Sequence, residues 1–241
     1  MGGAPLVIAH RGAATEAPEN TIEAFDLSVL LGADALELDV QQAGDGTLVV
    51  IHDSTVDRTT EADGPVAGFS GAELDRLGVP ALEEVLERYA RLEITVDVKA
   101  SSATSEVVAL IERLERTFST ILYVEEGTGL GAFATYGGRR ATSSRQAAWL
   151  AAQLACGVDA ATELPEGFPE VVHAPLDGPD GPIVTAELVA SAQRLGRTVQ
   201  VWTIDDPGRM RQLRHWGVDG IITNDVRRAV ELLKEDDEGG R

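Results

Sequence analysis

Short apolar runs alternate along the chain with longer segments in which apolar residues recur every three or four positions. The short runs are rich in β-branched residues, which is typical of buried strands, and the longer segments have the period of helices with one buried face. We expect eight strands, at Leu6–His10, Ala35–Gln41, Glu93–Lys99, Thr120–Glu125, Arg139–Ser143, Val171–Leu176, Val199–Ile204 and Gly220–Thr223. The helical segments between them are TIEAFDLSVLLG, ALEEVLERYARL, SEVVALIERLER, SRQAAWLAAQLACG, TAELVASAQRLG and GRMRQLRHWG, several of which end at glycine.

This repeated alternation predicts the fold class. Eight strand-and-helix units in 241 residues favour an α/β fold, a parallel (β/α)8 TIM barrel. No G-x-G-x-x-G motif follows the first predicted strand, which argues against an open nucleotide-binding sheet. We expect a single barrel domain over residues 1–241, ending in a frayed acidic tail at about 234–241.

The second unit departs from this pattern. After ALELDVQ the chain reaches Asp45-Gly46, a dipeptide typical of hairpin turns, and then a second extended run, TLVVIH. Residues 53–80 are rich in Gly, Asp and Thr and are expected to form a long loop. The sequence therefore predicts a small insertion after the second strand, at about residues 42–80, on the face of the barrel where active sites are built.

Charge and composition restrict the partners. Twenty Lys and Arg against forty Asp and Glu give a net charge of −20, which repels nucleic acid and anionic membrane surfaces. Cys156 is the only cysteine, no signal peptide is predicted, and no window holds eighteen uninterrupted apolar residues. We predict a cytoplasmic protein with a small-molecule substrate, no nucleic-acid partner and no stable membrane insertion. The sequence does not specify an oligomeric state.

Two predicted strands carry charged residues at alternate positions. Because side chains alternate along a strand, Glu37 and Asp39 share one face of ALELDV, and Asp97 and Lys99 share one face of EITVDVK. Burying three neighbouring carboxylates is costly unless a cation compensates them, and a hard divalent ion with oxygen ligands does so. We therefore predict a metal site; in the alternative, Lys99 alone neutralises a carboxylate.

Two histidines are expected at the same face of the barrel. His10 ends the first predicted strand and His52 ends the hairpin run. An imidazole titrates near a pKa of about 6.5, which suits a general acid and a general base, although both residues could instead be metal ligands. His173 and His215 have no charged partners at matching spacing, and we interpret them as structural.

Several motifs together carry a family resemblance. HRGAATEAPENT, GADALELDV, DGTLVVIHDSTVDRTT, VQVWTIDD and GVDGIIT occur in this order. At these spacings they resemble the signature of the glycerophosphodiester phosphodiesterases, closely from Leu6 to about Lys99 and from about Val184 to Thr223, and weakly over about 115–170. The resemblance implies a (β/α)8 barrel with an insertion after the second strand. It also implies hydrolysis of glycerophosphodiesters to sn-glycerol 3-phosphate and an alcohol, a reaction of lipid and glycerol metabolism.

The resemblance also implies roles for individual residues. One divalent ion, Mg2+ or Ca2+, would bind to Glu37, Asp39 and Asp97. His10 and His52 would be the acid-base pair, acting through a cyclic phosphate intermediate.

Four further residues are implied in substrate binding. Arg11 and Lys99 would hold the phosphate oxygens, for which a guanidinium fork and an ammonium are suited. Glu19 is a further polar candidate, or it caps the following helix and supports the site indirectly. Trp202 would line the glycerol or headgroup pocket, or belong to the barrel core.

Two departures from the family pattern leave alternatives open. The third strand reads Val96-Asp97-Val98-Lys99. The family usually has glutamate at the position of Asp97, whereas the related phospholipase D toxins have aspartate there. The runner-up is therefore a phospholipase D, sphingomyelinase D-like or lysophospholipase D activity, and a third reading is a non-catalytic phosphodiester-binding barrel. The fourth strand lacks the usual serine-phenylalanine ending, and there Glu125 or Glu126 either reaches the site or, as we prefer, faces solvent.

Overall fold

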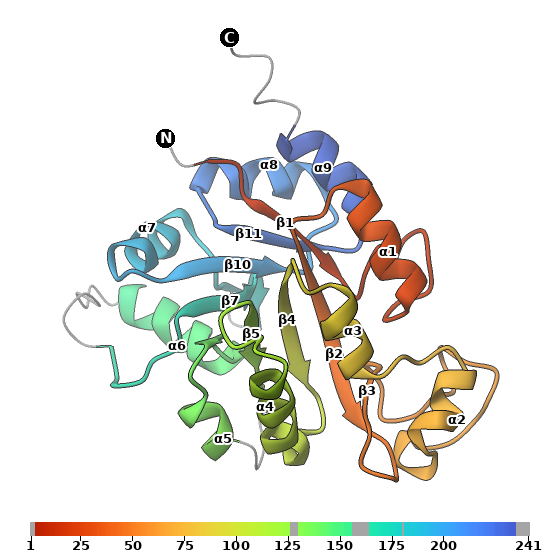
Figure 1. Ribbon diagram of the computed structural model, residues 1–241. Helices are drawn as coiled ribbons and strands as arrows, with labels where there is room; N and C mark the ends of the chain where they lie inside the picture. The colour runs from red at the N-terminus through yellow and green to blue at the C-terminus, as the bar shows by residue number, and fades with distance from the viewer. Residues whose placement is uncertain (1–2, 126–129, 156–163, 180, 235–241) are drawn as a thin grey trace.

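Eight parallel strands form a nearly closed barrel in the computed structural model, which describes residues 3–125, 130–155, 164–179 and 181–234 (Figure 1). The strands lie in the order β6-β5-β4-β2-β1-β11-β10-β7. A bridge between Ala141 and Val171 brings the two ends of this order together. The predicted fold class is confirmed. The barrel strands are β1 (Leu6–His10), β2 (Ala35–Gln42), β4 (Glu93–Val98), β5 (Thr120–Tyr123), β6 (Arg139–Arg140), β7 (Val171–Pro175), β10 (Thr198–Trp202) and β11 (Gly220–Thr223).

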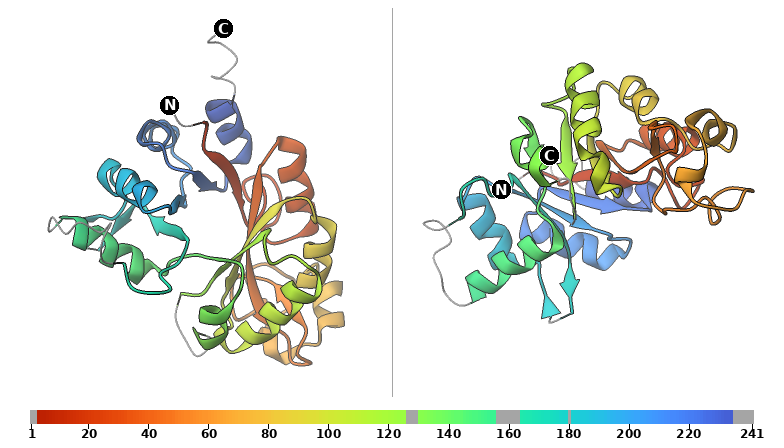
Figure 2. Two further views of the ribbon diagram at one scale, coloured as in Figure 1. Left: turned by 60° about the vertical axis from the view of Figure 1, so that its left-hand side comes forward. Right: turned by 90° about the horizontal axis from the view of Figure 1, so that it is seen from below.

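Helices cover the outside of the barrel (Figure 2). The six predicted helical segments correspond to α1, α3, α4, α6, α7 and α8, whereas α5 and α9 were not predicted. α1 shows the expected termini, since Thr21 caps its start through a hydrogen bond from the amide of Ala24 and Gly32 ends it in the left-handed region. The outer helices are α1 (Ile22–Leu31), α3 (Leu82–Arg88), α4 (Thr104–Arg113), α5 (Leu130–Thr135), α6 (Ser144–Ala155), α7 (Ala186–Arg194), α8 (Pro207–Trp216) and α9 (Val226–Lys234).

The predicted insertion follows β2. The chain turns at Asp45-Gly46 and returns as β3 (Leu48–Val50), which pairs antiparallel with β2. The segment expected to be a loop contains a short helix, α2 (Gly71–Arg76), so that expectation was wrong there. Ser70 and Glu73 form a capping box at its start, and this S-x-x-E spacing was the overlooked signal. The insertion buries a small core of its own: Ala43, Val49, Ile51, Val56, Val66, Leu74 and Val79.

Some predicted strand ends were too long. β6 stops at Arg140, because Ala141 forms only an isolated bridge with Val171. Ser143 lies just before α6, and its amide donates to Gln146 Oε1 of that helix. β10 stops at Trp202, and the amide of Ile204 donates instead to the carbonyl of Ile222. Four short elements complete the described chain: the 3-10 turns Val66–Gly68 and Ser101–Ala103, and the strands β8 (Asp177–Gly178) and β9 (Gly181–Pro182), which pair as a ribbon.

Alternation along the strands separates two apolar layers. Leu36, Leu38 and Val40 of β2 belong to the main core between the sheet and the helices. Other residues fill the barrel interior, among them Ile8 with Ile222 and Tyr123 with Val171. Because the leucines of β2 point outward, toward the helices, Glu37 and Asp39 must point into the barrel interior.

No helix among the described residues is long and apolar enough to cross a membrane. The cytoplasmic location stays a prediction. The predicted acidic tail and Glu126 lie outside the described residues.

Candidate active site

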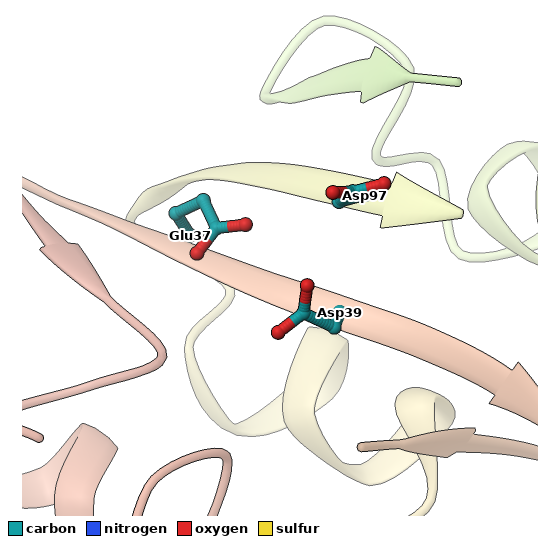
Figure 3. A group of neighbouring side chains, drawn as sticks. All are labelled: Glu37, Asp39 and Asp97. Carbon is teal, nitrogen blue, oxygen red and sulfur yellow. The ribbon is translucent and has the colours of Figure 1, made fainter. Parts of the chain in front are cut away.

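Three carboxylates meet inside the barrel. Glu37 and Asp39 come from β2, and Asp97 of β4 lies directly beside Asp39 in the strand register (Figure 3). Each residue is nearly inaccessible, with exposed fractions of 5%, 1% and 7%. One oxygen of each lies within 4.8 Å of the others, so the three can hold a metal ion. The shorter Asp97 side chain still reaches the cluster.

Two cations touch this cluster. Lys99 Nζ lies 2.6 Å from Asp97 Oδ2 and 3.2 Å from Asp39 Oδ1. Arg11 Nε lies 3.0 Å from Asp39 Oδ2. The expected alternative, in which Lys99 neutralises a carboxylate, therefore describes part of the geometry.

These cations do not fully compensate the carboxylates. Burial, followed by the charges of Asp39 and Asp97, raises the pKa of Glu37 well above its usual value. Burial also raises the pKa of Asp97 to about 7, against the opposing charge of Lys99. Asp97 Oδ1 is buried without a hydrogen-bond partner. Uncompensated buried carboxylate oxygens fit a hard divalent ion.

The raised pKa of Asp97 gives the metal-free protein a pH dependence. Below about pH 4 this carboxyl is protonated both folded and unfolded, whereas between about pH 4 and 7 only the unfolded chain releases the proton. We expect the free energy of unfolding of the chelated protein to fall across this interval. Denaturant titrations in EDTA at several pH values measure this; an increase from pH 5 to 8 would contradict it.

The loop after β1 places Arg11 against the carboxylates. Its backbone has a positive φ of 56°, and Gly12 follows with φ of 89°. A Cβ on Gly12 would lie 2.5 Å from the Cβ of Ala24, so the close packing of this loop on α1 requires glycine. Asn20 closes the loop by donating from Nδ2 to Asp39 Oδ2 at 2.9 Å. Sequence reasoning did not assign Asn20 a role, although it lies in the PENT motif.

His10 is oriented by residues far along the chain. Asp205 accepts hydrogen bonds from Nδ2 and the backbone amide of Asn224, each at 2.8 Å. A carboxylate only accepts, so the Asn224 amide nitrogen must face Asp205 and Oδ1 must face His10 Nδ1, 2.7 Å away. Nδ1 therefore carries the proton and neutral His10 has its lone pair on Nε2.

The pKa values agree with this arrangement. Burial is the largest influence on His10 and leaves its pKa below the ordinary value despite the hydrogen bond with Asn224. For Asp205, burial acts to raise the pKa, but the hydrogen bonds from Asn224 and Thr223 outweigh it and the pKa is lowered. His10 thus favours the neutral form and Asp205 stays ionised.

His52 has a charged partner instead. Its Nδ1 donates to Asp53 Oδ1 at 2.7 Å. Hydrogen bonds from Arg58 and then from His52 lower the pKa of Asp53 to about 2. Arg58 also binds Glu19 at 2.7 and 2.9 Å, and Glu19 Oε1 lies 3.2 Å from Arg11. Asp53 and Arg58 were not singled out from the sequence, although both lie in HDSTVDRTT.

The two histidines and the three carboxylates line a cavity of about 380 Å³ in the barrel mouth. Eight of the nine predicted site residues line it: His10, Arg11, Glu37, Asp39, His52, Asp97, Lys99 and Trp202. Glu19 lines a neighbouring cavity of about 440 Å³, between the barrel and the insertion. Glu19 is not the cap of α1, which is Thr21.

Other residues of the wall were not expected. His173, interpreted as structural, is buried and lines the cavity. Burial lowers its pKa to about 3, so the ring is neutral. Glu125, expected to face solvent, is exposed but also lines the cavity. His215 lies exposed on α8, as a structural reading allows.

Comparisons with known proteins agree with this geometry. The sequence profile of the Glycerophosphoryl diester phosphodiesterase family matches residues 10–228. A glycerophosphodiester phosphodiesterase of Caldanaerobacter subterraneus subsp. tengcongensis is 33% identical, covering 95% of this chain and 98% of the relative. The crystal structure of a glycerophosphodiester phosphodiesterase from Agrobacterium tumefaciens has 25% identity and a TM-score of 0.73, covering 94% of this chain and all of that one. The Thermotoga maritima glycerophosphodiester phosphodiesterase structure has 24% identity and a TM-score of 0.77, covering 95% and 98%.

Proposed function

The chain belongs to the glycerophosphoryl diester phosphodiesterase family and is a phosphodiesterase, and from this premise we propose that it hydrolyses glycerophosphodiesters to sn-glycerol 3-phosphate and an alcohol by a metal-dependent, two-histidine mechanism. One observation carries the mechanism. His10 and His52, which both line the cavity, have their Nδ1 atoms bound to different partners, a neutral amide and a carboxylate. This difference supports separate roles as base and acid.

The acid cluster is the proposed metal site. Glu37, Asp39 and Asp97 would hold one divalent ion, Mg2+ or Ca2+, since all three offer hard oxygen ligands. When bound, such an ion supplies a Lewis acid that neutralises phosphate oxygens. Arg11 and Lys99, which also line the cavity, would bind the same oxygens through charged hydrogen bonds.

In the first step His10 would act as the base. Its Nε2 lone pair accepts the proton of the glycerol 2-hydroxyl, and the oxygen attacks phosphorus. His52 gives the proton of Nε2 to the departing alcohol oxygen as the phosphorus–oxygen bond breaks. The ionised Asp53 offsets the positive charge of the His52 imidazolium before this transfer. The product is a cyclic glycerol phosphate.

In the second step the roles reverse. His52, now neutral, accepts a proton from water, which attacks phosphorus. His10 returns its proton to the 2-oxygen, and sn-glycerol 3-phosphate is released. Both histidines are restored, so no enzyme nucleophile is needed.

The substrate assay tests this function directly. We expect glycerophosphocholine to give sn-glycerol 3-phosphate and choline, with a transient cyclic phosphate seen by phosphorus NMR. Sphingomyelin and lysophosphatidylcholine serve as parallel substrates. Faster choline release from these than from glycerophosphocholine would favour the phospholipase D alternative and contradict the proposal.

Asn224 is expected to matter through His10. Asn224→Leu removes the acceptor of His10 Nδ1–H, and partners of this kind contribute about 10- to 100-fold to activity. We expect kcat to fall by that factor with a small change in KM, measured on glycerophosphocholine.

A swapped pair separates this role from a general structural defect. Asn224→Asp alone places a second carboxylate beside Asp205. In the double variant Asn224→Asp, Asp205→Asn, the new carboxylate accepts from His10 Nδ1 and also from the new amide at position 205. We expect the double variant to recover much of the kcat that each single variant loses. If the two losses simply add, Asn224 and Asp205 do not act on His10 as a pair.

A further inference from the structure

The wall of the central cavity formed by β5, β7 and β10 is aromatic. The Tyr123 and His173 ring centroids are 4.7 Å apart, and those of His173 and Trp202 are 5.7 Å apart. All three residues line the cavity. The neutral His173 places no positive charge in this wall. Tyrosine and tryptophan rings attract cations to their faces.

Glu125 places a negative charge beside these rings. Its Oε2 atom accepts hydrogen bonds from Tyr123 Oη and, at 2.9 and 3.2 Å, from the backbone amide and Oγ of Ser144. Among the residues that the structure describes, no Lys, Arg or His forms an ion pair with Glu125. The hydrogen bonds fix the carboxylate at the cavity, and its Oε1 atom makes no hydrogen bond within the described part of the chain.

The cavity therefore has two electrostatically different parts. Arg11 and Lys99 lie in one part, beside the three carboxylates of the metal site. Glu125 and the aromatic rings lie in the other. The parts are close, because Tyr123, which donates a hydrogen bond to Glu125, lies beside Asp97 in the strand register. A ligand that fits both parts carries a phosphodiester and, near it, a positive charge.

We propose that Glu125, together with the Tyr123 and Trp202 rings, forms a subsite for a positively charged alcohol moiety, so that this chain prefers glycerophosphodiesters of amino or quaternary ammonium alcohols. The inference rests on the proposed function and specifies the substrate class of that site. An ammonium group beside Glu125 forms a charge pair with the carboxylate and also contacts the ring faces. The hydroxyl groups of a neutral alcohol can only hydrogen-bond to the carboxylate, so such an alcohol binds less well.

The experiment compares three substrates that differ in the alcohol. For the wild-type protein we expect kcat/KM to be about tenfold higher with glycerophosphoethanolamine and glycerophosphocholine than with glycerophosphoglycerol, the size of effect that a cation bound by aromatic rings and a carboxylate gives. Glu125→Gln keeps an oxygen that accepts from Tyr123 and Ser144 but removes the charge. We expect it to reduce the preference to about twofold or less.

Glu84→Gln is the matched control. It makes the same chemical change at an exposed residue of the neighbouring cavity. Glu84→Gln should leave all three kcat/KM values and the substrate preference unchanged. If this variant loses the preference, the net charge of the protein and not Glu125 causes the preference, and the proposal is overturned.

Three further outcomes would also overturn the proposal, in different ways. If the wild-type protein hydrolyses all three substrates equally well, the subsite is wrong and the proposed function stands. If it hydrolyses none of them under any divalent metal, the proposed function fails and the subsite with it. If Glu125→Gln lowers all three values by one factor, Glu125 acts on the glycerol or the metal site instead.

Discussion

His10→Ala and His52→Ala are each expected to lower kcat for glycerophosphocholine by about 10³-fold, within the range that general acid-base catalysis contributes. Removing His10 leaves no lone pair to accept the proton of the 2-hydroxyl. Removing His52 leaves the departing alcohol without a proton donor. KM should change little, because Arg11, Lys99 and the metal site still bind the phosphate. Steady-state kinetics on both variants provide the measurement.

His215→Ala is the matched control for these variants. This histidine is exposed on α8, outside the cavity. It should retain wild-type kcat. Circular dichroism and thermal melting show whether each variant is folded. A folded His10→Ala or His52→Ala protein with more than a tenth of the wild-type kcat would remove that histidine from the mechanism.

Glu37→Gln is expected to have opposite effects on activity and on stability. The amide is a poorer ligand for a hard cation and carries no charge, so metal affinity and kcat should each fall by about 100-fold or more. The metal-free variant should nevertheless be more stable than the metal-free wild type at pH 8. In the wild type, burial and the charges of Asp39 and Asp97 raise the pKa of Glu37, so folding suppresses its ionisation and costs stability at pH 8. Glutamine does not ionise and avoids this cost.

Two measurements check this pair of effects. Isothermal titration with Mg2+ and Ca2+ gives the change in metal affinity, and urea unfolding in EDTA gives the change in stability. The sign of the stability change depends on pH: because the folded pKa of Glu37 is raised, its penalty is absent below the unfolded pKa and grows as pH increases. A variant that binds metal normally, or that is less stable than wild type in EDTA at pH 8, would contradict the assignment of Glu37.

Much of the fold could be predicted from hydrophobic pattern alone. β1 and β11 were predicted with their observed bounds, since they consist of short apolar runs bounded by polar residues or glycine. α2 was missed because a capping box of ordinary surface residues sets its start. α9 was missed because no strand follows it to complete another unit. The end of β6 depends on the Ala141–Val171 bridge, a contact between distant residues that no local pattern contains.

The metal site was visible in the sequence because alternation is a local property. Glu37 and Asp39 on one strand and Asp97 on another must face the barrel interior once the leucines and valines face the helices. The three carboxylates lie close together because β2 and β4 are parallel neighbours, with Asp39 beside Asp97 in the register.

The partners of the histidines could not be found in the same way. Asn224 reaches His10 from a position 214 residues further along the chain, because β11 pairs with β1. The aromatic wall likewise combines Tyr123, His173 and Trp202 from three strands. Only closure of the barrel brings these side chains together, so their roles emerge at the level of tertiary structure.

Metal dependence of glycerophosphodiester hydrolysis tests the central claim most directly. The protein is dialysed against EDTA, and release of sn-glycerol 3-phosphate from glycerophosphocholine is followed as Mg2+ or Ca2+ is added back, with Glu37→Gln measured alongside. We expect no turnover in chelator. When one ion has bound per chain, the wild-type protein should recover its full activity, whereas Glu37→Gln should not. Undiminished hydrolysis by the wild-type protein in excess EDTA would contradict the account.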